Sequence, residues 1–244
     1  MAIASWLDRV LYRHPFEGAS ARRYADAERP AFGDFDDRLL DALAPYLAPH
    51  DARSHDRDHG GTPSISATDD ATRRTGVPHT HVSLLDVGAG PGTFAMRAAA
   101  RFPSLRVIAV EPSRDFARPR AGVRVACARG EALPLADASV DVAICLSSIR
   151  HVRDRRATLR ELRRVVRRGG RLVIVELDPA SSARRIAAHA DHLASRLLRH
   201  AFGPLVVRTA PPVAAIEALA HDAGWTTAAC RDDAVQPVYI LELA

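Results

Sequence analysis

The chain has 244 residues, of which 47% are hydrophobic and 26% charged, with a formal net charge of +5. This composition excludes a largely disordered chain, and the length favours one domain of ordinary size. Every one of the 34 basic residues other than histidine is an arginine, which indicates a general preference for arginine and leaves a nucleic-acid partner unsupported.

Two amphipathic segments are expected within residues 1–49, which we predict to form an N-terminal helical cap. Neither could bury its apolar stripe alone, so both should pack on another part of the chain. Their apolar faces consist of Trp6, Leu7, Val10 and Leu11, and of Leu39, Leu40, Leu43 and Leu47. The first residues include Asp8 and Arg9 and show no cleavage site of a signal peptide, so we expect a cytoplasmic protein without membrane insertion.

Residues 50–81 contain almost no large apolar side chain, and we predict a flexible polar insertion there. Five histidines fall in it, but their spacing fits no helical ligand pair and cysteine is absent, so a polar loop is favoured over a metal site. They are His50, His55, His59, His79 and His81. The three cysteines of the chain are widely spaced, which argues against a disulfide framework and a cysteine zinc site.

Residues 82–244 are predicted to form the main domain. The runs "VSLLDV", "LRVIAV", "VRVAC", "VDVAICLS" and "RLVIVEL" are continuously apolar, which is typical of strands covered on both faces. Because helical or turn segments separate them, they indicate a doubly wound α/β sheet. Near the end, "WTTAACR" and "PVYILEL" are close enough to form an antiparallel edge hairpin. We therefore predict a seven-stranded, mostly parallel sheet.

Two helices have clear end signals. In "DRRATLRELRRVVRRGG", Asp154 can cap the start, arginines occupy the last turn and Gly169 should end the helix. In "PPVAAIEALAHDAGW", Pro212 suits the first turn and Gly224 the end.

The stretch "LLDVGAGPGTF" places Gly88, Gly90 and Gly92 between a predicted strand and a helix expected to begin near Thr93. Glycines in this arrangement let a ligand lie against the main chain. A phosphate-binding GxxxxGK[ST] loop is excluded, since the chain has no lysine. The dinucleotide fingerprint GxGxxG needs its third glycine one position later than Gly92.

Four stretches in order resemble the motifs of the class I S-adenosylmethionine-dependent methyltransferases, and especially the small-molecule branch that includes the ubiquinone and menaquinone C-methylases. They are "LLDVGAGPGTF", "VIAVEPS", "ARGEALPLADASVDVAICLSSIRHVRD" and "LRRVVRRGGRLVIVELDP". The resemblance is close over residues 82–178. It implies a Rossmann-like methyltransferase fold, S-adenosyl-L-methionine as cofactor, S-adenosyl-L-homocysteine as product and a small-molecule methyl acceptor.

The resemblance also implies a set of cofactor contacts. The glycine loop should hold the amino acid end and ribose, and Glu111 should accept hydrogen bonds from both ribose hydroxyls. Arg129 stands where many relatives carry an aspartate, so main-chain groups near Gly130 and Glu131 are expected to hold the adenine instead. The full set is Asp86, Gly88, Ala89, Gly90, Gly92, Glu111, Pro112, Gly130, Glu131, Cys145 and Leu146.

Three residues are candidates for a catalytic role. His151 lies where relatives often have two histidines, and it is either a general base or a packing histidine. Glu176 ends the fifth strand and is expected to face the ligand crevice, either orienting a substrate or accepting a backbone amide. Tyr24 is either a lid contact or a core tyrosine. Cys145 is not expected to act as a nucleophile, because nothing in its surroundings suggests a lowered pKa.

The preferred function is methyl transfer to oxygen, nitrogen or carbon of a small molecule. A methyltransferase acting on RNA or protein would carry a continuous arginine surface beside the cofactor crevice, and a non-catalytic cofactor-binding scaffold would lack room for a substrate. The sequence identifies neither the methyl acceptor nor the oligomeric state.

Overall fold

The apolar runs form one sheet in the computed structural model, which describes residues 17–19, 21–22, 34–48, 81–193 and 196–244. The interior strands are buried along almost their whole length, as expected for strands covered on both faces. The strands are β1 (Ser83–Val87), β2 (Arg106–Val110), β3 (Val123–Ala126), β4 (Val140–Leu146), β5 (Val166–Leu177), β6 (Thr227–Asp232) and β7 (Val238–Leu243).

The strand order is β3-β2-β1-β4-β5-β7-β6. Strands β1 to β5 pair in parallel. Strand β7 runs antiparallel to β5, and β6 runs antiparallel to β7 at the sheet edge. The prediction of a doubly wound, mostly parallel seven-stranded sheet with an antiparallel edge hairpin is confirmed. The order also places β1 and β4 side by side at the centre, where the chain reverses its direction of winding.

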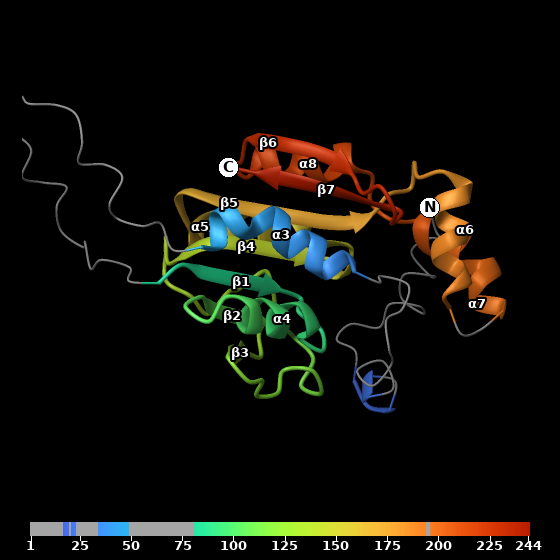
Figure 1. The fold of residues 1–244 in the computed structure, drawn as a ribbon. Coiled ribbons are helices and arrows are strands. Elements are labelled where there is room, and N and C mark those ends of the chain that lie inside the picture. The colour runs from blue at the N-terminus through green and yellow to red at the C-terminus, as the bar shows by residue number, and fades with distance from the viewer. Residues whose placement is uncertain (1–16, 20, 23–33, 49–80, 194–195) are drawn as a thin grey trace, which may run out of the picture.

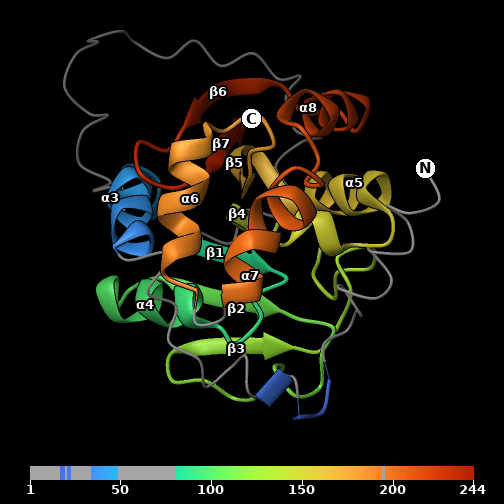
Figure 2. The ribbon, with the colours of Figure 1, turned by 90° about the vertical axis from the view of Figure 1, so that its right-hand side faces the viewer.

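Helices cover both faces of the sheet (Figure 2). Helices α3 (Phe35–Leu47) and α4 (Thr93–Arg101) lie on one face, and α5 (Arg155–Val165) and α8 (Val213–Asp222) lie on the other. Each face has its own cluster of buried apolar side chains, so the sheet separates two hydrophobic layers. The end signals of α8 are confirmed, because Pro212 caps its start and Gly224 follows its end with a φ of +87°.

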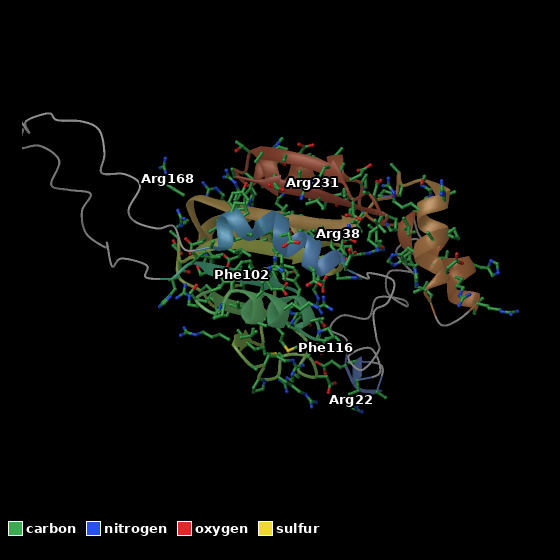
Figure 3. The ribbon with its side chains drawn as sticks, viewed as in Figure 1. Arg22, Arg38, Phe102, Phe116, Arg168 and Arg231 are labelled. Atoms are coloured by element: carbon green, nitrogen blue, oxygen red, sulfur yellow. The ribbon has the colours of Figure 1, made fainter. Side chains whose placement is uncertain are left out.

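Helix α3 buries the leucine stripe that the sequence predicted, and it shares the core of the sheet. Arg38 of α3 forms an ion pair with Asp233, which precedes β7, with 3.2 Å between Nη1 and Oδ2, and Figure 3 shows Arg38 beside the sheet. Residues 1–16, 20 and 23–33 of the predicted cap, Tyr24 included, and residues 50–80 of the predicted insertion lie outside the described residues. The domain boundaries at residues 49 and 81 therefore stay predictions.

A helical segment lies beyond the carboxyl ends of the parallel strands (Figure 1). It consists of α6 (Ala183–Asp191), α7 (Arg196–Ala201) and a π-helical turn, η2 (Phe202–Val207). Its buried residues, among them Ile186, Phe202 and Val207, join the core on the α3 and α4 side of the sheet. The segment thus stands at the edge where ligands bind in sheets of this type.

The end of α5 differs from the prediction. Asp154 caps its start as expected, accepting a hydrogen bond from the Ala157 amide at 2.9 Å. The helix ends at Val165, however, and not at Gly169. Val166 is buried and pairs with β4. The chain therefore enters a strand before the predicted last turn of the helix is complete. Arg168 consequently extends from a strand into solvent at the end of the molecule opposite α6 and α7 (Figure 3).

Asp141 links three strands of the sheet through its carboxylate. It accepts hydrogen bonds from the amide and hydroxyl of Ser83 at 2.8 and 2.7 Å, and Arg167 pairs with its other oxygen. Burial opposes ionisation, but these hydrogen bonds outweigh it and hold the pKa of Asp141 below its usual range. The carboxylate therefore stabilises the fold above the ordinary aspartate pKa of about 3.9, and this contribution is lost as the pH falls below it.

We expect Asp141→Ala to lower the free energy of unfolding by about 2–3 kcal/mol at neutral pH, because it leaves three hydrogen-bond donors without their acceptor. Urea denaturation measures the loss. Asp137→Ala is the control, since its side chain is 77% exposed in its ion pair with Arg164, and it should cost less than about 1 kcal/mol. Equal losses for the two variants would contradict the role given to Asp141.

Candidate functional site

The glycine loop joins β1 to α4 at the carboxyl end of the sheet. Gly88, Gly90 and Gly92 all have positive φ angles, of +73°, +55° and +79°. A Cβ atom on Gly88 would lie 2.5 Å from the Cβ of Ser148, whereas one on Gly90 would meet nothing within 4 Å. The loop thus needs glycine at Gly88 to pack against the protein itself, while Gly90 leaves open space beside its main chain.

Glu111 follows β2 directly and ties the glycine loop to the neighbouring strand. Only 7% of the surface of Glu111 is exposed to solvent. One carboxylate oxygen accepts the Gly90 amide at 2.8 Å, and the other accepts the Ser113 amide at 2.9 Å. Burial raises the pKa of Glu111 above its ordinary value, and the two amides partly offset this rise. The carboxylate is therefore held in a fixed orientation at the base of the loop.

The segment after β3 closes the site from the other side. A Cβ on Gly130 would lie 2.9 Å from Thr158 Cγ2 and 3.3 Å from Val87 Cγ1, so the main chain approaches α5 and β1 closely there. The Glu131 carboxylate accepts the amides of Arg153 and Asp154 at 2.7 and 3.0 Å. The Glu131 side chain thus fixes the chain that enters α5.

These elements enclose a cleft of about 860 Å³, counted with its open mouth. Nine residues proposed from the sequence line it: Gly88, Ala89, Gly90, Glu111, Pro112, Gly130, Glu131, Leu146 and His151. The structure therefore brings eight of the eleven expected cofactor contacts together, from four separate parts of the chain, and adds His151 from a fifth.

Three expected cofactor contacts do not line this cleft. Asp86 is 2% exposed, near the end of β1, and Gly92 forms the start of α4. Cys145 is fully buried in β4, and burial raises the pKa of its thiol to about 12. A thiol with this pKa stays protonated at neutral pH, which agrees with the expectation that Cys145 is no nucleophile. The roles of these residues in cofactor binding stay predictions.

Glu176 does not face the crevice as expected. Its residue surface is fully buried, and its carboxylate accepts the amides of Arg150 at 3.3 Å and Leu177 at 2.8 Å. Strand β5 ends beneath a short 3₁₀ turn, η1 (Ile149–His151), which separates Glu176 from the cleft. Of the two roles considered for Glu176, its placement matches the acceptance of backbone amides.

His151 is the one catalytic candidate that reaches the cleft among the described residues. It belongs to η1, whose backbone is closed by a hydrogen bond from the His151 amide to the Ser148 carbonyl at 2.9 Å. A role as general base is compatible with this position and stays a prediction. Tyr24 lies outside the described residues.

Several cleft residues were not anticipated from the sequence. Ser147 has a φ of +51°, which is uncommon for a residue other than glycine and often marks a functional site. Ser148 donates its hydroxyl to the Val87 carbonyl at 2.6 Å and so fixes the end of β4 against β1. No sequence signal marks either serine. The other unanticipated lining residues are Val87, Pro91, Phe116, Arg129, Val152 and Arg153.

Two kinds of site are absent from the described part of the chain. It contains no group of three or more histidine, cysteine or acidic side chains placed to hold a metal ion. It also contains no helix with the length and apolar character that crossing a membrane requires. Four of the five histidines of residues 50–81 lie outside the described residues.

Comparisons with known proteins match the part of the chain that carries the cleft. A family model described as a methyltransferase domain matches residues 85–174. Demethylmenaquinone methyltransferase of Deinococcus radiodurans is 36% identical over 112 residues, which are 43% of this chain and 46% of that protein. The ubiquinone/menaquinone biosynthesis C-methyltransferase UbiE of Syntrophotalea carbinolica is 36% identical over 103 residues, covering 39% of this chain and 44% of that protein. The matches thus span less than half of either relative.

The fold is shared more widely than the sequence. A SAM-dependent methyltransferase from Aquifex aeolicus aligns with a TM-score of 0.61 over 93% of this chain and 98% of that chain, at 13% sequence identity. Such low identity shows a common fold only. The match to a methyltransferase domain over residues 85–174 includes the glycine loop and every residue that lines the cleft, and the sheet has the fold of this SAM-dependent methyltransferase.

Proposed function

We propose that the protein binds S-adenosylmethionine in the cleft and transfers its methyl group to a small molecule. The observation that carries this proposal is the Glu111 carboxylate, which the amides of Gly90 and Ser113 hold at the base of the glycine loop. Each carboxylate oxygen can accept more than one hydrogen bond. Glu111 therefore keeps acceptor capacity for the two hydroxyls of a ribose, and this acceptor fits the cofactor.

The protein's own part in the reaction is binding and orientation. When bound, S-adenosylmethionine supplies a methyl group on a sulfonium, which is already a good leaving group. Glu111 would hold the ribose, and main-chain groups at Gly88 and Gly90 would contact the ligand closely. The apolar side chains of Leu146 and Val152 line the cleft and would exclude water. Such positioning accounts for up to about 7–11 kcal/mol of a reaction barrier.

His151 is our candidate for removing a proton from the acceptor, because it lines the cleft while Glu176 is buried behind η1. Residues 1–49 and the segment over the carboxyl ends of the strands are proposed to shape the acceptor site. We propose a cytoplasmic location on the basis of the three free cysteines.

The affinity for S-adenosylhomocysteine should depend on pH through Glu111. Since burial raises its pKa above the ordinary value, its carboxyl takes up a proton at a higher pH than an exposed glutamate, and a neutral carboxyl is a poorer acceptor for ribose hydroxyls. We expect the affinity to fall as the pH is lowered from about 7.5 to about 5. Calorimetric titration across this range measures the change. Glu111→Gln should bind more weakly at neutral pH and show little of this dependence; an equal pH dependence in the variant would contradict the assignment.

The acceptor can be sought with S-adenosylmethionine labelled on its methyl group. The two named relatives act in quinone biosynthesis according to their names, so demethylated quinones are the first acceptors to test, followed by pooled small metabolites. Label found in small molecules, together with S-adenosylhomocysteine, supports the proposal. Label found only in RNA or protein would favour the first alternative. Cofactor binding without any turnover would favour a regulatory scaffold.

The alternative of an RNA methyltransferase has one feature in its favour, since Arg129 and Arg153 line the cleft. Two arginines of the helix that follows Arg153, α5, are already paired within the protein itself. Arg156 pairs with Asp222 at 2.8 Å, and Arg164 pairs with Glu161 and Asp137. A small-molecule acceptor therefore remains the preferred proposal.

A further inference from the structure

Arg150 lies between the cleft and the helical segment that covers the carboxyl ends of the strands. It belongs to η1, and its neighbour His151 lines the cleft. The Arg150 side chain is only 5% exposed and does not line the cleft itself. An arginine is seldom buried to this extent unless its charge and its donors are engaged.

The Arg150 guanidinium reaches two other parts of the fold. Its Nη1 lies 3.8 Å from Oε1 of Glu176, at the end of β5. Its Nη2 donates to the Val206 carbonyl of η2 at 3.0 Å and lies 3.5 Å from the Thr209 hydroxyl. One planar group thus joins the end of the sheet to the segment above it, in a fork that a lysine could not reproduce.

The main chain of Arg150 is held as well. Its amide donates to Oε2 of Glu176 at 3.3 Å, and its carbonyl accepts from Arg155 Nη2 at 3.2 Å. Arg155 Nε also donates to the Ile149 carbonyl at 3.2 Å. Glu176 is fully buried, so its charge depends on these arginines for compensation. Glu176 thus contacts both the guanidinium and the main chain of Arg150, which links the side chain to the backbone of η1 beside the cleft.

We propose that Arg150 is a positioning residue that couples residues 202–209 to the cleft, so that their packing and the occupation of the cleft stabilise each other. The geometry between Arg150, η1 and η2 carries the linkage itself. The part that concerns a bound ligand rests on the proposed function. By reciprocity, a ligand that orders the cleft wall also orders residues 202–209.

The linkage can be tested without a ligand by hydrogen exchange. Arg150→Lys keeps a positive charge beside Glu176 but cannot span all its acceptors. We expect it to speed exchange at least about fivefold, the lower end of typical couplings between sites, in residues 148–154 and in residues 202–209. Exchange in β4 should not change. Faster exchange in residues 202–209 alone would overturn the coupling, because Arg150 would then hold only the segment.

Two further variants make this test decisive. Arg156→Lys is the matched control, since Arg156 lies on α5 in an ion pair with Asp222 and is 44% exposed; it should leave both segments unchanged. Thr209→Val removes a contact of Arg150 from the far side and leaves the pair with Glu176 intact. Like Arg150→Lys, it should speed exchange in residues 148–154. The proposal can therefore still be tested if Arg150→Lys does not fold.

The second stage adds S-adenosylhomocysteine. In the unchanged protein we expect the ligand to slow exchange in residues 202–209, although none of them lines the cleft. In Arg150→Lys the protection should stay confined to the cleft. Bound ligand without protection of residues 202–209 would overturn the coupling. Absence of any binding would instead contradict the proposed function, and the ligand-free comparison would then decide the role of Arg150 alone.

Discussion

Replacing Glu111 by alanine should weaken the binding of S-adenosylhomocysteine about ten- to hundredfold. Hydrogen bonds to a charged group contribute roughly 1.5–3 kcal/mol, and about 1.4 kcal/mol corresponds to a factor of ten. The variant loses the acceptor for ribose hydroxyls and also leaves the Gly90 and Ser113 amides without theirs. Calorimetric titration of the purified variant measures the loss directly.

The control for this experiment is a carboxylate outside the cleft. Asp222→Ala removes an acidic side chain that is 54% exposed on α8 and pairs with Arg156, and its affinity should equal that of the unchanged protein. Circular dichroism should show that both variants are folded. Full affinity in folded Glu111→Ala would remove Glu111 from the site and leave the glycine loop without its proposed partner.

Gly88→Ala should destabilise the protein by about 2–5 kcal/mol, the sum of the strain of a positive φ and of an overpacked contact. The strain arises from a φ of +73°, and the contact from a new Cβ at 2.5 Å from the Ser148 Cβ. Gly90→Ala should cost only about 1–2 kcal/mol, since its Cβ would meet open space and only the strain remains. Urea denaturation of both variants measures the difference.

A second-site change separates the two causes. Ser148→Gly removes the Cβ that Gly88→Ala would meet, and it also removes the hydroxyl that donates to the Val87 carbonyl. Measured against Ser148→Gly alone, the added Gly88→Ala should therefore cost only the strain part. Gly90→Ala, although folded, should bind S-adenosylhomocysteine more weakly, because its methyl group occupies space beside the loop. Equal destabilisation by Gly88→Ala and Gly90→Ala would contradict the close contact between Gly88 and Ser148.

The sheet could be predicted because its strands carry a signal that needs no tertiary context. Runs such as "VAICL" are apolar at consecutive positions, and a run of that length bounded by turn residues is typical of a strand covered on both faces. The leucine stripe of α3 was equally clear, and the structure buries it. The apolar pattern did not show which part of the chain this stripe packs on, because the contact with the sheet depends on residues far along the chain.

The prediction that α5 ends at Gly169 was wrong for a physical reason. Local propensity favours continuing the helix through its arginines to Gly169, but Val166 gains a place in the sheet opposite Val140. Pairing with a distant strand thus outweighed helix propensity, which amounts to less than about 1 kcal/mol per residue for ordinary residues. Such competition is decided by tertiary contacts.

The part of the candidate site that is formed by the main chain of the glycine loop could be predicted from the sequence. Gly88 and Gly90 are required by the backbone, and Glu111 follows a strand that can be recognised. Glu176 also ends a strand, yet η1 covers it, and no residue pattern announces a 3₁₀ turn at that place. Which of two neighbouring side chains faces the cleft, His151 and not Arg150, likewise depends on how η1 is held from outside.

The central claim is that this cleft binds S-adenosylmethionine, and isothermal titration of the purified protein tests it most directly. S-adenosylmethionine and S-adenosylhomocysteine should be titrated separately at neutral pH. We expect saturable binding of both with dissociation constants in the micromolar range, which corresponds to about −8 kcal/mol. If neither ligand binds to folded protein, the cleft is not a site for this cofactor, and the glycine loop returns to the dinucleotide alternative.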